Sequence, residues 1–220
     1  MKRQQAGFTL VEIAIVLVII GLLLGGILKG QELVQNARVR NLADQQNAVA
    51  AAYYAFQDRY RALPGDYAAA MTNIPNVTAA PACAAPCVQG NSQITAEERV
   101  FAWYHLTNAG FISCPVCATD PTPTAATPGT NNSVLNAYNG FMVLEYDAAY
   151  QGSAAVQVNN LKGGFQVPSN ILAEVDRKLD DGSPTTGKFR NSTASPAACA
   201  PVANWESVNP QASCQAVNLF

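Results

Sequence analysis

Charged residues are scarce in this chain. Only 13% of its 220 residues are Asp, Glu, Lys or Arg, whereas about a quarter is usual for globular domains. The formal net charge is -2, and the two basic pairs, Arg38 with Arg40 and Arg59 with Arg61, are interspersed with acidic residues. A nucleic-acid groove needs clustered lysine and arginine. No nucleic-acid partner is therefore expected.

Histidine is almost absent, because His105 is the only one. It lies within a predicted amphipathic helix, where a packed or partly exposed ring is expected. No Ser-His-Asp, Cys-His, phosphate-binding-loop or histidine-based metal constellation can be assembled from the sequence. The sequence therefore predicts no catalytic residue, no cofactor and no enzymatic activity.

One long segment lacks charge almost completely. Phe8 to Leu28 comprises 21 residues, of which only Glu12 is charged, and a helix of that length spans roughly 30 Å, the thickness of a bilayer core. A secretory signal peptide is disfavoured, because the apolar run is too long and no clear small-residue cleavage site ends it. A plain membrane anchor fits the length but does not explain a carboxylate within the span, which costs about 2.5 to 3.5 kcal/mol at a helix centre.

The residues at the start of this segment resemble a processing site. The run GFTLVE, from Gly7 to Glu12, begins with the last residue of the seven-residue leader MKRQQAG. This arrangement is similar to the N-terminus of type IV pilins and of the pseudopilins of type II secretion systems. The resemblance implies that a prepilin peptidase cuts after Gly7 and N-methylates the new terminal residue, Phe8.

The same resemblance suggests a use for Glu12. Cleavage would create an α-amino group on Phe8 with a pKa of about 8, and Glu12 of a neighbouring subunit could neutralise that cation at membrane depth. Such a pairing would set the axial register between subunits. The alternative is that Glu12, so near the helix end, simply reaches the lipid headgroups.

The resemblance therefore implies a structural subunit of a type IV pilus or a type II secretion pseudopilus. Residues 1–7 would be a cytoplasmic leader, and residues 8–28 would span the bacterial inner membrane before assembly. Afterwards the subunit would lie in a pilus, at the cell surface or in a periplasmic pseudopilus. Its partners would be other pilin or pseudopilin subunits, prepilin peptidase, the inner-membrane assembly platform and membrane lipid. The alternative function is a membrane-anchored exported adhesin or binding module that does not polymerise.

Proline is absent from residues 29–63, so the helix is expected to continue to a stop at Pro64-Gly65-Asp66. Its apolar residues form one stripe, consisting of Leu28, Leu42, Val49, Phe56 and Leu63, with Ala52, Tyr53 and Tyr60 between them. Many major pilins of the type IVa class carry a helix-breaking proline where this chain has Lys29. The absence of that proline favours a minor pilin or a pseudopilin.

Residues 64–220 are predicted to form the exported globular domain. Strands are expected at residues 140–146, 154–158 and 164–167. Helices are expected from the capping box at Thr95 to near Gly110, and from Pro168 to Leu179. The last thirty residues are expected to be loops. The predicted fold class is α+β and pilin-like, with a long N-terminal helix packed against a small antiparallel sheet and with loops stapled by disulfides.

Six cysteines lie beyond the apolar segment, at Cys83, Cys87, Cys114, Cys117, Cys199 and Cys214. An even number fits an oxidising compartment, and fifteen full pairings are possible. Cys199 with Cys214 resembles the C-terminal disulfide loop of many pilins. The other four either close locally, as Cys83 with Cys87 and Cys114 with Cys117, or cross-link their two loops, and local closure is slightly favoured.

Two other uses of these four cysteines are weighed against disulfides. Thiolates at these spacings can ligate a structural zinc ion, but an oxidising compartment favours disulfides. Cys114 and Cys117 could form a redox-active dithiol, which needs a lowered thiol pKa at a helix N-terminus. Here the predicted helix precedes the motif, so a structural disulfide is expected.

Asp176, Asp180 and Asp181 suggest a calcium site, since hard cations bind clustered carboxylate oxygens. Their spacing is not that of an EF-hand loop, and Asp180-Asp181-Gly182 is ordinary helix-stop and turn sequence. No metal is therefore the main expectation, and calcium is the minority hypothesis.

Overall fold

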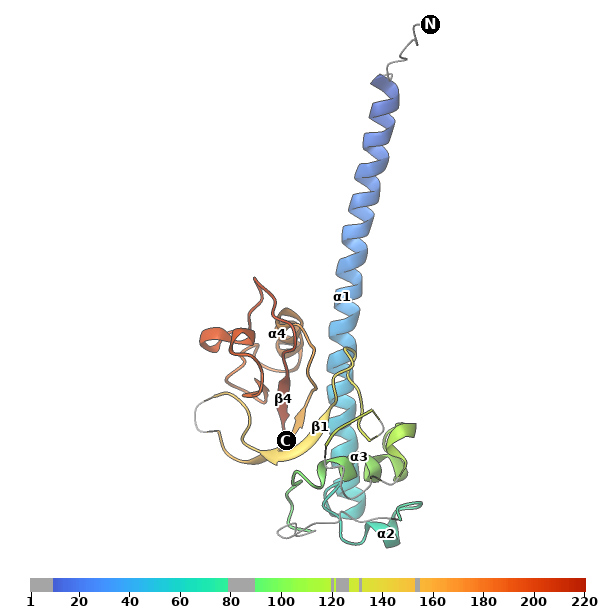
Figure 1. Ribbon diagram of the computed structural model, residues 1–220, viewed down its shortest axis with the longest axis vertical. Coiled ribbons are helices and arrows are strands. Elements are labelled where there is room, and N and C mark those ends of the chain that lie inside the picture. Colours follow the sequence, from blue (N-terminus) through green and yellow to red (C-terminus); the bar gives the residue numbers. More distant parts are fainter. Residues whose placement is uncertain (1–9, 79–89, 120, 122–126, 131, 153–154) are drawn as a thin grey trace, which may run out of the picture. The chain divides into compact units, whose positions relative to one another are not determined.

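A computed structural model describes residues 10–78, 90–119, 121, 127–130, 132–152 and 155–220 (Figure 1). The chain divides into two compact units, and the boundary falls within the first helix, between Arg38 and Val39. The described part of the first unit is entirely helical, and the second unit carries the remaining helices and the sheet. The structure confirms the predicted α+β class.

Helix α1 runs without interruption over Leu10–Tyr60, a length of 51 residues. No proline occurs within it, and Ala, Leu and Gln are common, so its sequence favours continuous helix. It ends three residues before the predicted end at Leu63. The reason is Arg61, which adopts a left-handed backbone (φ 53°) and donates its N–H to the carbonyl oxygen of Gln57 at 2.9 Å. A left-handed residue directly after the last turn ends a helix.

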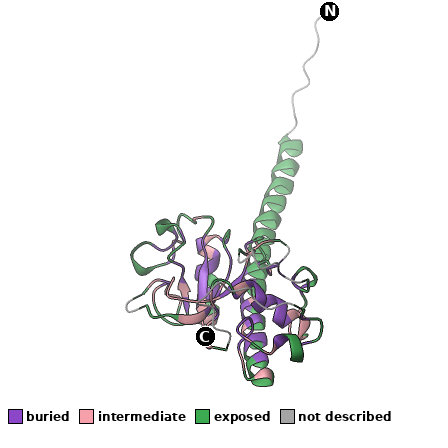
Figure 2. Ribbon diagram, turned by 60° about the horizontal axis from the view of Figure 1, so that its bottom comes forward, coloured by how far each residue is buried: buried purple, intermediate pink, exposed green. Residues whose placement is uncertain are grey.

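In the second unit, α1 buries one face. Leu42, Val49 and Phe56 are all at most 4% exposed, as the seven-residue spacing of the predicted stripe requires. Leu63 is buried too, although it lies beyond the helix end. Leu28 was predicted to belong to this stripe, but that prediction is wrong: it lies in the first unit and is 67% exposed. Figure 2 shows this change from exposed to buried residues along α1.

Two short helices and a 3-10 turn follow α1: α2 (Ala70–Asn73), α3 (Arg99–Asn108) and η1 (Pro115–Cys117). Helix α3 begins at Arg99, four residues after Thr95, which is the first residue of the predicted capping box. Glu98 nevertheless accepts hydrogen bonds from the Thr95 N–H at 2.8 Å and from its hydroxyl at 2.9 Å, which is the backward half of a capping box. The helix ends at Asn108, with Ala109 as its C-cap and Gly110 in a left-handed conformation, close to the predicted end near Gly110.

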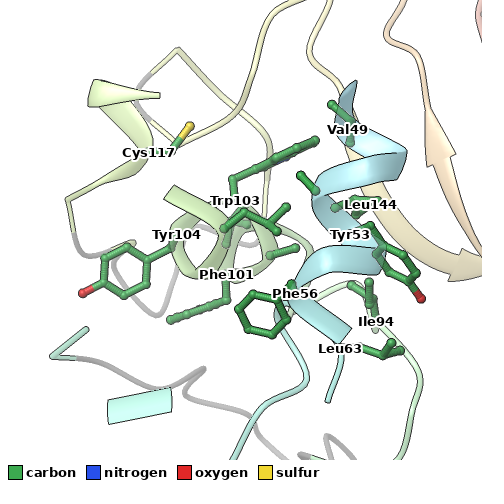
Figure 3. Packing of buried hydrophobic residues seen from close by; sticks show 14 of the residues in the cluster. Val49, Tyr53, Phe56, Leu63, Ile94, Phe101, Trp103, Tyr104, Cys117 and Leu144 are labelled. Carbon is green, nitrogen blue, oxygen red and sulfur yellow. The ribbon is translucent and has the colours of Figure 1, made fainter. Parts of the chain in front are cut away.

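Helix α3 packs almost completely into the core. Trp103 is 1% exposed and donates its indole N–H to the carbonyl oxygen of Met142 at 3.1 Å. It belongs to the same buried cluster as Phe56 of α1 and Leu144 of the sheet (Figure 3). This cluster joins the long helix, α3 and one side of the sheet.

The sheet has four antiparallel strands in the order β1-β2-β4-β3. Their bounds are β1 (Val143–Asp147), β2 (Val158–Lys162), β3 (Phe189–Asn191) and β4 (Ala216–Leu219). Leu144 pairs with Leu161, and Phe189 pairs with Asn218. All three apolar side chains are buried in the two core clusters, so this face of the sheet forms the inner side.

Only the first predicted strand overlaps well with an observed one. The strand predicted at 154–158 lies four residues too early, because β2 begins at Val158, and residue 154 is outside the described residues. Residues 164–167 do not form a strand: Val167 makes only an isolated bridge with Cys214. The prediction of loops throughout the last thirty residues is also wrong, since β4 lies there in the interior of the sheet.

Helix α4 (Ser169–Leu179) begins after Pro168, as predicted. Its apolar residues Ile171, Leu172 and Val175 are at most 4% exposed. They form a second buried cluster with Leu42 of α1. The 3-10 turns η2 (Ala197–Cys199) and η3 (Pro201–Ala203) lie in the loop that leads to β4.

Candidate functional site

The N-terminal candidate site lies at the start of α1. Gly7 and Phe8, the predicted processing residues, are outside the described residues. Glu12 lies in the first turn of α1 and is exposed. A carboxylate there is favoured by the partial positive charge of a helix N-terminus.

The surface of α1 from Leu10 to Leu28 is apolar on every side of the helix apart from Glu12. Large side chains such as Leu10, Leu22 and Leu28 are 86%, 73% and 67% exposed. Within the described residues, α1 is long and apolar enough to cross a membrane, and none of its apolar window is buried. A helix that is hydrophobic all round is normally covered by lipid or by other protein.

The first charged pair after the apolar surface is Lys29 with Glu32. The Lys29 ammonium lies 2.7 Å from the Glu32 carboxylate, and both side chains are mostly exposed. Both ions suit an aqueous or headgroup environment better than hydrocarbon. They mark the polar end of the apolar part of α1.

Four of the six cysteines are within the described residues, and they form two disulfides. Cys114 is joined to Cys117, and Cys199 is joined to Cys214. Cys83 and Cys87 lie outside the described residues. Both sulfurs of the CPVC motif are therefore oxidised and are not thiolate ligands for zinc, and Cys117 is only 2% exposed. The first bond lies in the cluster around α3, and the second lies in the cluster around α4.

Asp176, Asp180 and Asp181 do lie together, with one carboxylate oxygen of each within 4.8 Å of the others. The protein itself supplies donors to all three. The buried Asp176 accepts the Trp205 indole N–H at 2.7 Å and the Gly182 N–H at 3.2 Å.

The two exposed carboxylates of this cluster stabilise the turn before β3. Asp180 accepts the backbone N–H groups of Lys188 and of Phe189, the latter at 3.0 Å. Asp181 accepts the Ser183 N–H at 2.9 Å. These contacts give the acidic cluster a structural task, and the calcium hypothesis for it stays a prediction.

Burial raises the pKa of Asp176 to about 6, although its hydrogen bonds from Trp205 and Gly182 oppose that shift. The link from Trp205 to Asp176 was not predicted. The two residues are 29 apart in the sequence, and no local pattern connects them. Through this bond α4 is tied to the loop closed by Cys199 and Cys214.

His105 is packed in the core, which is one of the two environments expected for its ring, packed or partly exposed. It is 0% exposed, and its Nδ1 accepts the Gly65 N–H at 3.0 Å. Burial lowers its pKa to about 3, so the imidazole is neutral at pH 7. It holds the Pro64-Gly65 turn against α3 and has a structural role.

These features define a class of protein: an α+β domain preceded by an exposed apolar helix with an acid in its first turn. A family model described as the prokaryotic N-terminal methylation motif matches residues 2–28. The match covers all of the leader except Met1, together with Phe8 and Glu12, and it supports a type IV pilin-like precursor. The motif alone does not separate pilins from pseudopilins.

No curated protein and no solved structure matches the chain. The motif nevertheless implies processing by a prepilin peptidase and assembly with other pilins. It is also consistent with anchoring in a membrane before assembly, and it suggests a structural protein.

Proposed function

We propose that this chain is a prepilin subunit that is cut after Gly7, N-methylated on Phe8 and assembled through α1 into a type IV pilus or a type II secretion pseudopilus. The observation that carries the proposal is the coincidence of three features in one segment. They are the methylation motif over residues 2–28, Glu12 in the first turn of α1, and an exposed apolar surface beginning at Leu10.

The apolar surface supports assembly on energetic grounds. Keeping one large aliphatic side chain such as Leu22 out of water is worth about 1.5 to 3 kcal/mol. The exposed part of α1 carries many such side chains, so the subunit must pass from lipid to another apolar environment. The α1 helices of neighbouring subunits offer that environment.

Glu12 supports a specific register in that assembly. A carboxylate surrounded by apolar helices needs a partner, and processing after Gly7 would supply the Phe8 amine of a neighbouring subunit. The pair would form only when adjacent helices are offset so that the two groups meet. In this mechanism Glu12 selects one axial offset from many that apolar packing alone would allow.

The continuity of α1 favours a minor pilin or a pseudopilin. The helix passes through Lys29 without interruption, at the position where many type IVa major pilins carry a proline. The proposed partners are other pilin or pseudopilin subunits, prepilin peptidase and the inner-membrane assembly platform.

The test compares two acids of α1. Glu12→Leu should leave membrane insertion intact and abolish most incorporation into sheared filaments or pseudopili. Glu32→Leu, outside residues 2–28, is the matched control and should assemble normally. Normal incorporation of the Glu12→Leu variant would rule out the proposed register mechanism.

Intact-protein mass spectrometry tests processing independently. The mature chain should begin at N-methylated Phe8, and any other mature N-terminus would contradict the assignment. If the wild-type chain is processed but stays wholly in the membrane fraction, with none in sheared filaments or pseudopili, the alternative of a non-polymerising adhesin or binding module would be favoured.

A further inference from the structure

A cavity of about 430 Å³ opens on the outer side of the sheet, in the second unit. Val143 and Glu145 of β1 line it together with Lys162 of β2. Val143 pairs directly with Lys162, and alternate residues of a strand share a face. The cavity therefore lies on the face opposite to Leu144 and Leu161, which point into the core. Its size falls within the range of about 300 to 1,000 Å³ that is usual for small-molecule sites.

Three charged residues line the cavity, Arg99, Glu145 and Lys162, and we call them its floor. They are joined by ion pairs that continue to Asp147. Glu145 lies 3.4 Å from the Arg99 guanidinium and 2.7 Å from the Lys162 ammonium, and Lys162 also contacts Asp147. The side chains of Glu145 and Lys162 are only 12% and 14% exposed. Burial alone would raise the pKa of Asp147, but the hydrogen bonds from Lys162, Asn160 and the Ala149 N–H, together with the charge of Lys162, outweigh it, and the pKa is lowered.

This floor has two cations and one anion, and the second anion, Asp147, pairs with Lys162 without lining the cavity. Both cations are therefore already paired with carboxylates, and the floor offers no unpaired positive charge to a phosphate or another strong anion. It still presents both hydrogen-bond donors and acceptors. A ligand that suits it carries groups that both donate and accept, without a formal charge of its own.

The walls of the cavity are partly aromatic and partly amide. Phe141 and Phe165 line it, and Phe165 is 38% exposed. Asn139, Gln166 and Gln215 also line it. Aromatic rings cover apolar surface, while amides donate and accept hydrogen bonds. A pyranose ring matches this combination, because it has an apolar C–H face and a rim of neutral hydroxyl groups.

The walls are held in place before any ligand binds. The buried Asn136 donates to the carbonyl oxygens of Gly163 at 2.9 Å and Phe165 at 3.2 Å, and it accepts the Gly140 N–H at 2.8 Å. A Cβ at Gly140 would lie 2.1 Å from the Phe165 carbonyl oxygen, so only glycine permits this close approach. Binding to a cavity with fixed walls loses less conformational entropy.

We propose that this cavity binds a neutral sugar residue of a glycan. The site is separate from α1 and from the methylation motif, so it does not depend on how the subunit is processed or assembled. Phe141 and Phe165 would cover the apolar face of the ring, and the amides with the Arg99–Glu145–Lys162 floor would bind its hydroxyl groups.

The test uses the full chain in a detergent without a sugar headgroup. Methyl glycosides of glucose, galactose, mannose and N-acetylglucosamine are the probes, and ligand-observed NMR measures binding. We expect at least one of them to bind with a Kd on the order of 1 mM. Phe165→Ala should weaken that binding about tenfold, and Tyr54→Ala, which removes an exposed aromatic ring outside the cavity, should not change it.

A second variant guards against misfolding of the first. Gln166 has a left-handed backbone (φ 72°), so Gln166→Gly should fold well and weaken sugar binding about threefold or more. Absence of binding by every neutral glycoside would overturn the proposal. Equal binding by wild type and both cavity variants would also overturn it, as would tighter binding of glucuronic acid or inorganic phosphate than of the neutral sugars.

Discussion

The two parts of α1 show that hydrophobic content and burial are different properties. The described residues before Val39 are the more apolar part, and all of them are exposed. From Val39 onward the helix is more polar, yet Val39, Leu42 and Val49 are at most 4% exposed. The first part is apolar on all sides and suits lipid or partner helices, whereas the second has one apolar face and packs within its own unit.

The largest expected effect comes from making the same substitution in both parts. Leu42→Ala should destabilise the second unit by about 2 to 5 kcal/mol, because the side chain of Leu42 is only 3% exposed and its truncation leaves a cavity in the core. Leu22→Ala, at a residue that is 73% exposed, should change the unfolding free energy by less than about 0.5 kcal/mol. Denaturant unfolding in detergent, followed by tryptophan fluorescence, measures both. Equal losses would erase the distinction between the two parts.

Removing the covalent links tests how the second unit keeps its packing. In the loop-entropy relation a 15-residue loop is worth about 3 kcal/mol and a loop of three or four residues about 1.5 to 2 kcal/mol. Cys199 and Cys214 are 15 residues apart in the sequence, whereas Cys114 and Cys117 are 3 apart. Replacing the first pair by Ala should therefore lower the unfolding free energy more than replacing the second pair. Insertion of the first part into a membrane should not change. The opposite order of stabilities would contradict the prediction.

The pH should act on the packed part through Glu98. Burial raises its pKa from 4.5 to about 7, against the opposing hydrogen bonds from Thr95. The folded state therefore binds the Glu98 proton more tightly than the unfolded state does. The stability that this proton gives the folded state is fully present below pH 4.5 and is lost as the pH rises through about 7. Between pH 5 and pH 8, ionisation of Glu98 should lower the unfolding free energy of the wild type by an amount on the order of 1 to 3 kcal/mol. The Glu98→Gln variant should not show this decrease.

Other buried groups also titrate, so the comparison is made between variants at each pH. Asp176 acts in the same direction as Glu98. His105 acts oppositely, because its lowered pKa makes stability fall as the pH drops below 6.5. Both contributions cancel in the difference between wild type and Glu98→Gln. Glu97→Gln, at an exposed neighbour, is the control, and a profile identical to that of Glu98→Gln would contradict the assignment.

The smallest effect is expected for the ion pair at the end of the apolar segment. Lys29→Ala breaks a contact between side chains that are 67% and 58% exposed. Such pairs contribute about 0 to 1 kcal/mol and are screened by salt. The unfolding free energy of the second unit should shift by less than about 0.5 kcal/mol, and a larger shift would show that residues before Val39 do contribute to its stability.

The sequence predicted the helices far better than the sheet. The stripe of Leu42, Val49 and Phe56 and the apolar face of α4 follow a period that a single segment displays by itself. Strand β2 has the sequence VNNLK, which has no clear alternation. It becomes a strand because β1 and β4 lie on either side of it, and neither neighbour could be identified from residues 158–162 alone.

The candidate sites divide in the same way. The methylation motif and Glu12 could be recognised from a short run of residues, since a peptidase recognises local sequence. The pairing of Cys199 with Cys214 was expected only by resemblance, because spacing leaves fifteen pairings open. The cavity on the outer face of the sheet was not predicted at all. Arg99, Glu145 and Lys162 lie far apart in the sequence, and only strand pairing and α3 bring them together.

The sequence alone determined the apolar segment, its single acid, the continuity of α1 and the apolar stripe of its second part. Each of these depends on neighbours within one or two helical turns. The tertiary structure decided the end of α1 at Tyr60, the place of β4 inside the sheet, the bond from Trp205 to Asp176 and the shape of the cavity. These features arise from contacts between distant residues, whose free energies are realised only when the whole second unit folds.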